Sequence, residues 1–125
     1  METRVIKETT QMLIGPPAEP MPRERMDALA QLVASLPGAL EAHLPECLIV
    51  GGMEKPAQIL AIVFESPPLD STLEALGEGL TNILPAGEHL DMWPVAPNDP
   101  TLMDIRRVGC EIYLRPGRSY WQSVE

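Results

Sequence analysis

The sequence predicts a single α+β domain in which helices pack on a mixed β-sheet, in the order β-α-β-β-α-β-α-β. Short apolar runs alternate with segments whose apolar residues recur at helical spacing, and two runs follow each other without a helix between them. The 14 prolines stand between these segments and mark their ends. A chain of 125 residues that is 45% hydrophobic can bury a core without disulfides or metal.

The first apolar run, residues 11–14, stops at Gly15-Pro16-Pro17 and is typical of a strand followed by an extended connector. Residues 21–36 are predicted to form the first helix, with Pro22 in its first turn. The apolar residues of this helix fall on one face at helical spacing: Met26, Leu29, Val33 and Leu36.

Residues 40–44 alternate apolar and polar side chains, with Glu41 and His43 in the polar positions, which predicts a half-buried strand. Pro45 interrupts the run, so we expect an edge position or a bulge there before residues 47–50 resume it.

Residues 59–64 are the most apolar stretch and predict a central strand that is covered on both faces. Ser71 and Glu74 match a capping box at the start of the second helix. Gly77 and Gly79 each weaken this helix by roughly 1 kcal/mol relative to alanine, so we expect close packing against the sheet there. The apolar face of the helix comprises Leu73, Leu76, Leu80, Ile83 and Leu84.

Residues 88–95 alternate in character and predict a strand, on which Trp93 would need cover. Asp99-Pro100 supplies an N-cap and a first helical residue for the third helix, which ends at Gly109. Residues 111–114 predict the last strand. The predicted domain spans residues 10–116, between an N-terminal extension (1–9) and a C-terminal tail (117–125).

The net charge of −9 argues against nucleic-acid binding and against anionic membrane surfaces, because both need clustered Lys and Arg. No apolar run is long enough to span a bilayer, and the N-terminus has no apolar signal core. Two cysteines are too few for a secreted disulfide framework. We therefore expect a cytoplasmic location with both thiols reduced.

The histidines and cysteines, His43, Cys47, His89 and Cys110, could hold zinc only if the fold brought them together. Pro45 separates the first two and there is no CxxC pair, so we expect no structural metal and no cofactor. An apolar run around Cys47 and a helix C-terminus before Cys110 both disfavour a reactive thiolate.

Four carboxylates gather in sequence around the predicted strand 88–95 and the third helix: Glu88, Asp91, Asp99 and Asp104. Such a group can bind a divalent cation or carry out acid–base chemistry. It has no EF-hand spacing, and we expect a solvated acidic face. No phosphate-binding glycine loop or nucleophile elbow is present, so no catalytic residues are predicted.

Several stretches resemble the C-terminal domain of the bacterial enhanced serine sensitivity proteins, the SseB-type family. They are residues 13–17, the strand pair around Leu40 and Ile59, the stretch 84–91, and Tyr113 near the last strand. The resemblance covers roughly residues 10–115, at the scale of one domain. It implies the fold and a link to serine tolerance in bacteria, without an established catalytic activity.

Two departures accompany the resemblance. Family members usually carry a second domain on the N-terminal side, and residues 41–47 lack the family's tyrosine-containing stretch.

Our functional hypothesis is a non-enzymatic protein-interaction or regulatory domain of a bacterial cytoplasmic protein, which forms a homodimer or binds a protein partner. Methionines and aromatic residues suit adaptable interfaces. The candidate partner or ligand surface comprises Asp91, Trp93, Asp99, Arg106 and Tyr113. The alternative is a domain that binds an amino acid or related metabolite. An enzyme would need a pocket that joins the acidic group to His89 or Arg106.

Overall fold

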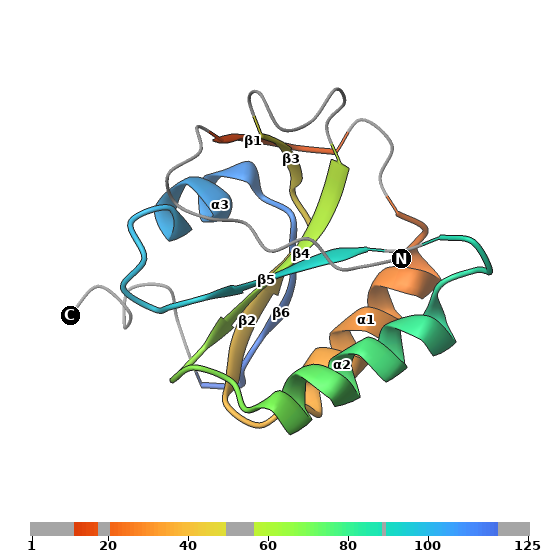
Figure 1. Ribbon diagram of the computed structural model, residues 1–125. Helices are drawn as coiled ribbons and strands as arrows, with labels where there is room; N and C mark the ends of the chain where they lie inside the picture. Colours follow the sequence, from red (N-terminus) through yellow and green to blue (C-terminus); the bar gives the residue numbers. More distant parts are fainter. Residues whose placement is uncertain (1–11, 18–20, 50–56, 89, 118–125) are drawn as a thin grey trace.

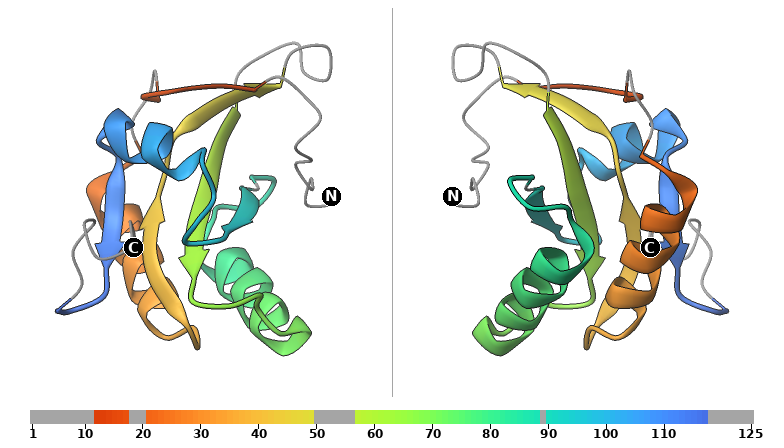
Figure 2. Two further views of the ribbon diagram at one scale, coloured as in Figure 1. Left: turned by 90° about the vertical axis from the view of Figure 1, so that its left-hand side faces the viewer. Right: turned by 90° about the vertical axis from the view of Figure 1, so that its right-hand side faces the viewer.

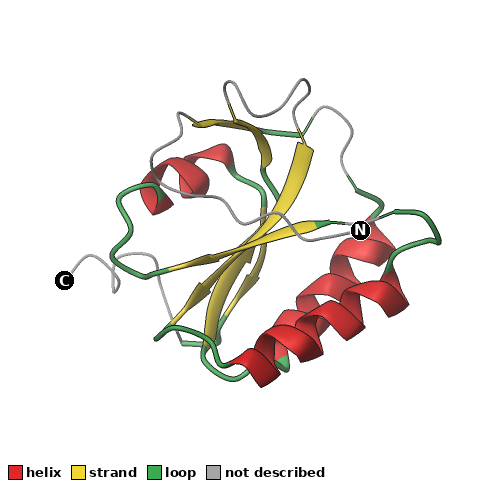
Figure 3. Cartoon of the chain, viewed as in Figure 1, coloured by secondary structure: helices red, strands yellow, loops and turns green. Residues whose placement is uncertain are grey.

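The computed structural model describes residues 12–17, 21–49, 57–88 and 90–117, which form a six-stranded sheet and three helices (Figure 1). The predicted α+β class is confirmed. The elements are β1 (Met12–Gly15), α1 (Arg23–Ala34), β2 (Ala39–His43), β3 (Glu46–Ile49), β4 (Ala57–Phe64), α2 (Asp70–Ile83), β5 (Asp91–Val95), α3 (Leu102–Val108) and β6 (Glu111–Leu114). Figure 3 shows how helices and strands divide the chain.

β4 is the centre of the sheet, as its apolar sequence predicts, and its residues from Ile59 to Phe64 are buried. β2 and β3 both run antiparallel along one edge of it, in one register from Glu41 to Cys47. His43 pairs with Ala61, and three residues further along each strand Glu46 pairs with Gln58. Pro45 therefore interrupts one long bent strand, and its carbonyl still accepts a hydrogen bond from the Ile59 N–H at 3.0 Å.

β5 lies parallel to β4 on the other edge, while the remaining ladders are antiparallel, so the sheet is mixed. α2 connects these two strands and makes a βαβ unit with them. β1 and β6 add to the sheet by pairing with β3 and β2 respectively.

The sheet carries a core on each face. Alternate residues of β4 point to opposite faces: Leu60 and Ile62 join the core under α1 and α2, whereas Ala61 and Val63 join the core under α3. α1 and α2 lie side by side on one face, and α3 lies apart from them (Figures 1 and 2). Because both faces are covered, β2 is fully buried and the prediction of a half-buried strand is wrong.

Two predicted helix caps also differ from the structure. α2 begins at Asp70 behind Leu69, with no side-chain cap, so the capping box at Ser71 and Glu74 does not form. α3 begins at Leu102 with Thr101 as its N-cap residue. The helix thus begins later than predicted, and Asp99 caps the turn before it, where its Oδ1 accepts a hydrogen bond from the Thr101 N–H at 2.8 Å.

The two glycines of α2 have different surroundings. A Cβ on Gly79 would overlap the side chain of Leu32 on α1, whereas a Cβ on Gly77 would meet nothing. Both glycines are predicted to pack closely against the sheet. Of the two, only Gly79 makes a close approach, and it does so to α1. Gly79 allows the two helices to come together.

This difference yields a matched pair of substitutions. Gly77→Ala is expected to stabilise the protein by about 1 kcal/mol through helix propensity. Gly79→Ala makes the same gain but must displace Leu32, which costs about 1–3 kcal/mol in a packed interface. In urea unfolding, the free energy of unfolding of Gly79→Ala should therefore be lower than that of Gly77→Ala. Equal stabilisation by both would show that Leu32 yields without cost.

Candidate functional site

The residues predicted for a partner or ligand surface do not form one surface. Asp91 begins β5 and is only 8% exposed. Trp93 is half-buried and packs against the core under α3, while Tyr113 packs against the opposite core. Asp99 lies in the turn before α3, and Arg106 makes a buried ion pair. The five residues are thus divided between both faces of the sheet.

The structure instead brings together Glu41, His43 and Arg106. Glu41 and His43 are two residues apart on β2, and Arg106 comes from α3, which covers that face. The Arg106 Nε donates to Glu41 Oε2 at 3.0 Å, and its Nη2 donates to Glu41 Oε1. His43 Nε2 lies 2.7 Å from Glu41 Oε2. One carboxylate therefore binds a guanidinium at both oxygens and an imidazole at one.

Opposing effects set the charge state of Glu41. Burial by itself raises the pKa of this carboxyl, but the hydrogen bonds from His43 and Arg106 and their charges outweigh it. The result lowers the pKa of Glu41 from 4.5 to about 2. Because an ionised carboxylate only accepts hydrogen bonds, the proton between it and His43 belongs to His43 Nε2.

This buried cluster is closed to a substrate. The side chains of Glu41 and His43 are 0% and 1% exposed, and that of Arg106 is 7% exposed. The ion pair between Arg106 and Glu41 joins α3 to β2. The bidentate guanidinium–carboxylate geometry fixes the helix in place as well as stabilising the charges.

The predicted acidic group is dispersed. Glu88 pairs with Arg25 of α1 at 3.3 Å, and Asp104 pairs with Arg107 at 3.6 Å on the exposed side of α3. His89 lies outside the described residues, as do the glycine pair 51–52, the extension 1–9 and the tail from residue 118. In the part of the chain that is described, no three His, Cys, Asp or Glu side chains converge as metal ligands.

The two cysteines have different positions but similar chemistry. Cys47 is fully buried in β3, and Cys110 is partly buried between α3 and β6. Burial raises the pKa of both thiols, and for Cys110 it outweighs the backbone hydrogen bonds that act the other way. Both are therefore poor nucleophiles near neutral pH.

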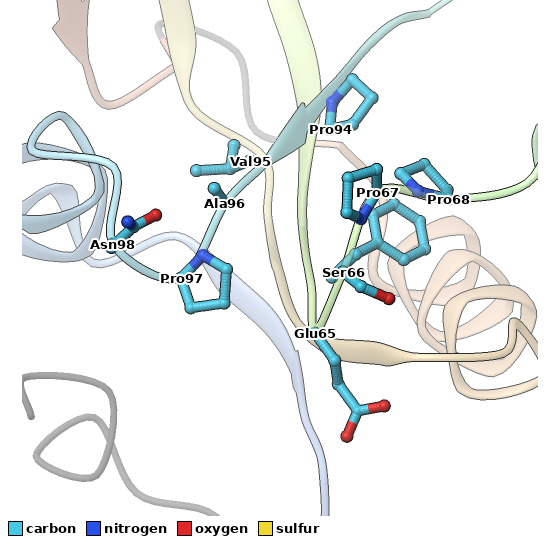
Figure 4. Close-up of a pocket in the computed structure, with 10 residues that line it drawn as sticks. Glu65, Ser66, Pro67, Pro68, Pro94, Val95, Ala96, Pro97 and Asn98 are labelled. Atoms are coloured by element: carbon cyan, nitrogen blue, oxygen red, sulfur yellow. The ribbon is translucent and has the colours of Figure 1, made fainter.

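A pocket of about 370 Å³ lies where β4 and β5 end (Figure 4). Residues 64–68 form one wall and residues 94–98 the other. We call it the proline pocket, because it is lined by Pro67, Pro68, Pro94 and Pro97. The carboxyl ends of neighbouring parallel strands are the usual position of ligand crevices in α/β sheets.

A second pocket, also of about 370 Å³, lies beside the start of α1 and is called here the α1 pocket. Apolar side chains and polar groups share its lining: Met21, Leu84 and Leu90 with Arg25, Gln58, Glu88 and Asp91. The Arg25–Glu88 ion pair joins α1 to the segment before β5. Of the sequence-predicted surface, only Asp91 contributes to either pocket.

Sequence reasoning missed the cluster and the proline pocket for different reasons. Glu41 and His43 looked like solvent-facing positions of an edge strand, and nothing local connects them to Arg106. For the proline pocket a signal existed: Pro67-Pro68 follows one strand of a βαβ unit, and Pro94 and Pro97 come at the end of the next.

In the described residues, no helix has the length and apolarity required to cross a membrane. Comparison of the chain with protein-family models, with curated proteins and with solved structures finds no match.

Proposed function

We propose that the chain is a non-enzymatic protein-interaction or regulatory domain of a bacterial cytoplasmic protein, related in fold to the SseB-type C-terminal domain. The observation that carries this proposal is the proline pocket, whose lining is mostly apolar, together with the exposed Leu69 next to it in the chain. Leu69 directly follows Pro68 and is 70% exposed, the most exposed of the large apolar side chains described. Exposed apolar surface beside a pocket is typical of docking sites.

The pocket is prepared for binding by its composition. Proline rings fix the φ angle, so the four prolines restrict the backbone of both walls before a partner arrives. A preordered site loses little conformational entropy on binding. Polar groups are few, which favours an apolar side chain over a polar metabolite.

The non-enzymatic part of the proposal is supported by how the reactive groups are used. Glu41 binds both His43 and Arg106 inside the core, and burial raises the pKa of both thiols. The polar groups at the proline pocket are Glu65, Ser66 and Asn98, and Glu65 is paired with Arg115 at 2.9 Å. In the described residues no hydrogen bond joins the Glu65 carboxylate to the Ser66 hydroxyl, so the two are not arranged as a general base and its nucleophile.

Site-specific photo-crosslinking in cells tests this function. A photoreactive phenylalanine analogue in place of Leu69 is expected to give a discrete protein adduct. The same analogue in place of Leu13 is the matched control, because Leu13 is also exposed, at 52%, but lies on β1. Adducts at Leu69 should decrease when Ala96→Arg places a charge in the proline pocket. Equal adducts at both positions would contradict the proposal.

A small-molecule function is the second candidate, and the α1 pocket favours it. A guanidinium and carboxylates border an apolar lining there, which suits a zwitterionic metabolite such as an amino acid. A true ligand at about a hundred times its Kd should stabilise the protein by about 2.7 kcal/mol in a thermal-shift panel.

The control for this candidate is a pair of neighbouring arginines. Arg25→Ala should abolish the shift, while Arg23→Ala, at an exposed position outside the pocket, should keep it. A panel of amino acids and related metabolites that produces no shift would exclude this candidate.

A further inference from the structure

We infer that the proline pocket binds a basic protein segment which inserts one aromatic side chain and places Lys or Arg residues on either side of it. This inference rests on the proposed interaction function and specifies the chemistry of the partner. It follows from the shape of the pocket, from the charges around it and from the strand edge beside it.

The pocket has room for a large side chain. A volume of about 370 Å³ is near the lower end for ligand pockets, which is roughly 300 Å³. In Figure 4 the rings of Pro67 and Pro68 lie across from the 94–97 segment, and an aromatic ring between them would contact proline rings. Aromatic side chains supply much contact area for little lost rotamer freedom, which is why they dominate interface hot spots.

The charges favour basic residues next to this anchor. The Glu65 carboxylate lies at one end of the pocket, and Asp70 and Asp99 follow its two walls closely in the chain. Arg115 forms an ion pair with Glu65, and in the described residues no ion pair involves Asp70 or Asp99. The whole chain carries a net charge of −9, so its field also attracts a basic segment and repels an acidic one.

The strand edge makes strand addition a poor alternative. In the described sheet β5 pairs with β4 only, so its other edge could in principle accept a strand. Pro94 lies within β5 and has no N–H to donate, which is a common way of protecting a sheet edge. Recognition by an inserted side chain is therefore favoured over recognition by backbone pairing.

Selection from a random peptide library displayed on phage tests the inference with the intact chain as bait. The expected result is enrichment of peptides with one Trp, Tyr or Phe flanked by Lys or Arg. A selected peptide, made synthetically, should bind Ala96→Arg about tenfold or more weakly by fluorescence polarisation. It should bind the control Leu13→Arg as it binds the wild type, and its affinity should fall with added salt.

The outcomes separate this inference from the proposed function. Enrichment of neutral or acidic peptides that still lose binding on Ala96→Arg would overturn the inferred chemistry and leave the interaction function standing. Peptides that bind Ala96→Arg and the wild type equally would overturn the pocket as their site. An empty selection, together with no adduct at Leu69, would overturn both. Thermal unfolding of each variant confirms that it is folded before binding is compared.

Discussion

Replacing Arg106 with methionine is expected to destabilise the protein by about 3–5 kcal/mol, because the buried carboxylate of Glu41 loses the charge that balances it. Methionine keeps much of the volume of the side chain, so the effect measures charge more than packing. In this variant His43 still donates a hydrogen bond to Glu41, but the carboxylate has lost the guanidinium that bound both of its oxygens. Urea denaturation, followed by circular dichroism, measures the change.

The control is the next residue of the same helix. Arg107 is 74% exposed and pairs only loosely with Asp104, so Arg107→Met should change stability by less than about 0.5 kcal/mol. A double variant, Glu41→Leu with Arg106→Met, should be more stable than Arg106→Met alone, since no unbalanced charge then remains buried. If Arg106→Met and Arg107→Met lost equal stability, the cluster would not hold α3.

The second large effect is a loss of stability in acid. The pKa of Glu41 is lowered from 4.5 to about 2 in the folded protein. A lowered folded-state pKa contributes stability that is present above pH 4.5 and is lost as the pH falls toward 2. Because Glu41 is fully buried, the full contribution is on the order of 3 kcal/mol.

A comparison with Glu41→Gln isolates this contribution from the other carboxylates. The variant has no titratable group at this position, so its stability lacks that pH-dependent part. The difference in unfolding free energy between wild type and Glu41→Gln should shrink by about 2 kcal/mol from about pH 5 to about pH 3. A constant difference over that range would show that Glu41 titrates normally.

The two effects bear on function through α3. This helix has seven residues, from Leu102 to Val108, and it covers the face of the sheet that carries Glu41 and His43. Such a short helix is not stable by itself and depends on tertiary contacts. Leu102 and Ile105 provide apolar contacts, and Arg106 provides the ionic one. The loop from Ala96 to Thr101, which connects the proline pocket to α3, is thereby anchored at its far end.

Local sequence patterns were sufficient for the elements and for their type. The continuous apolar run at 59–64 identified the central strand, because only a strand buried on both faces has no polar side. The helical spacing of Leu29 and Val33 identified the buried face of α1. Pro45 marked the bend in the long strand next to β4, since proline disturbs a ladder wherever it stands.

The same patterns could not show which groups meet in space. The alternation of residues 40–44 is the same whether α3 or water covers the polar side, and only packing decides between them. Arg106 meets Glu41 across 65 residues of chain, a separation that no spacing rule describes. The proline pocket likewise forms because α2 returns the chain to lie parallel beside β4. The sequence alone thus determined what each segment becomes, because that depends on near neighbours along the chain. The tertiary structure alone decided what the side chains do, because charge pairing and pocket walls depend on distance through space.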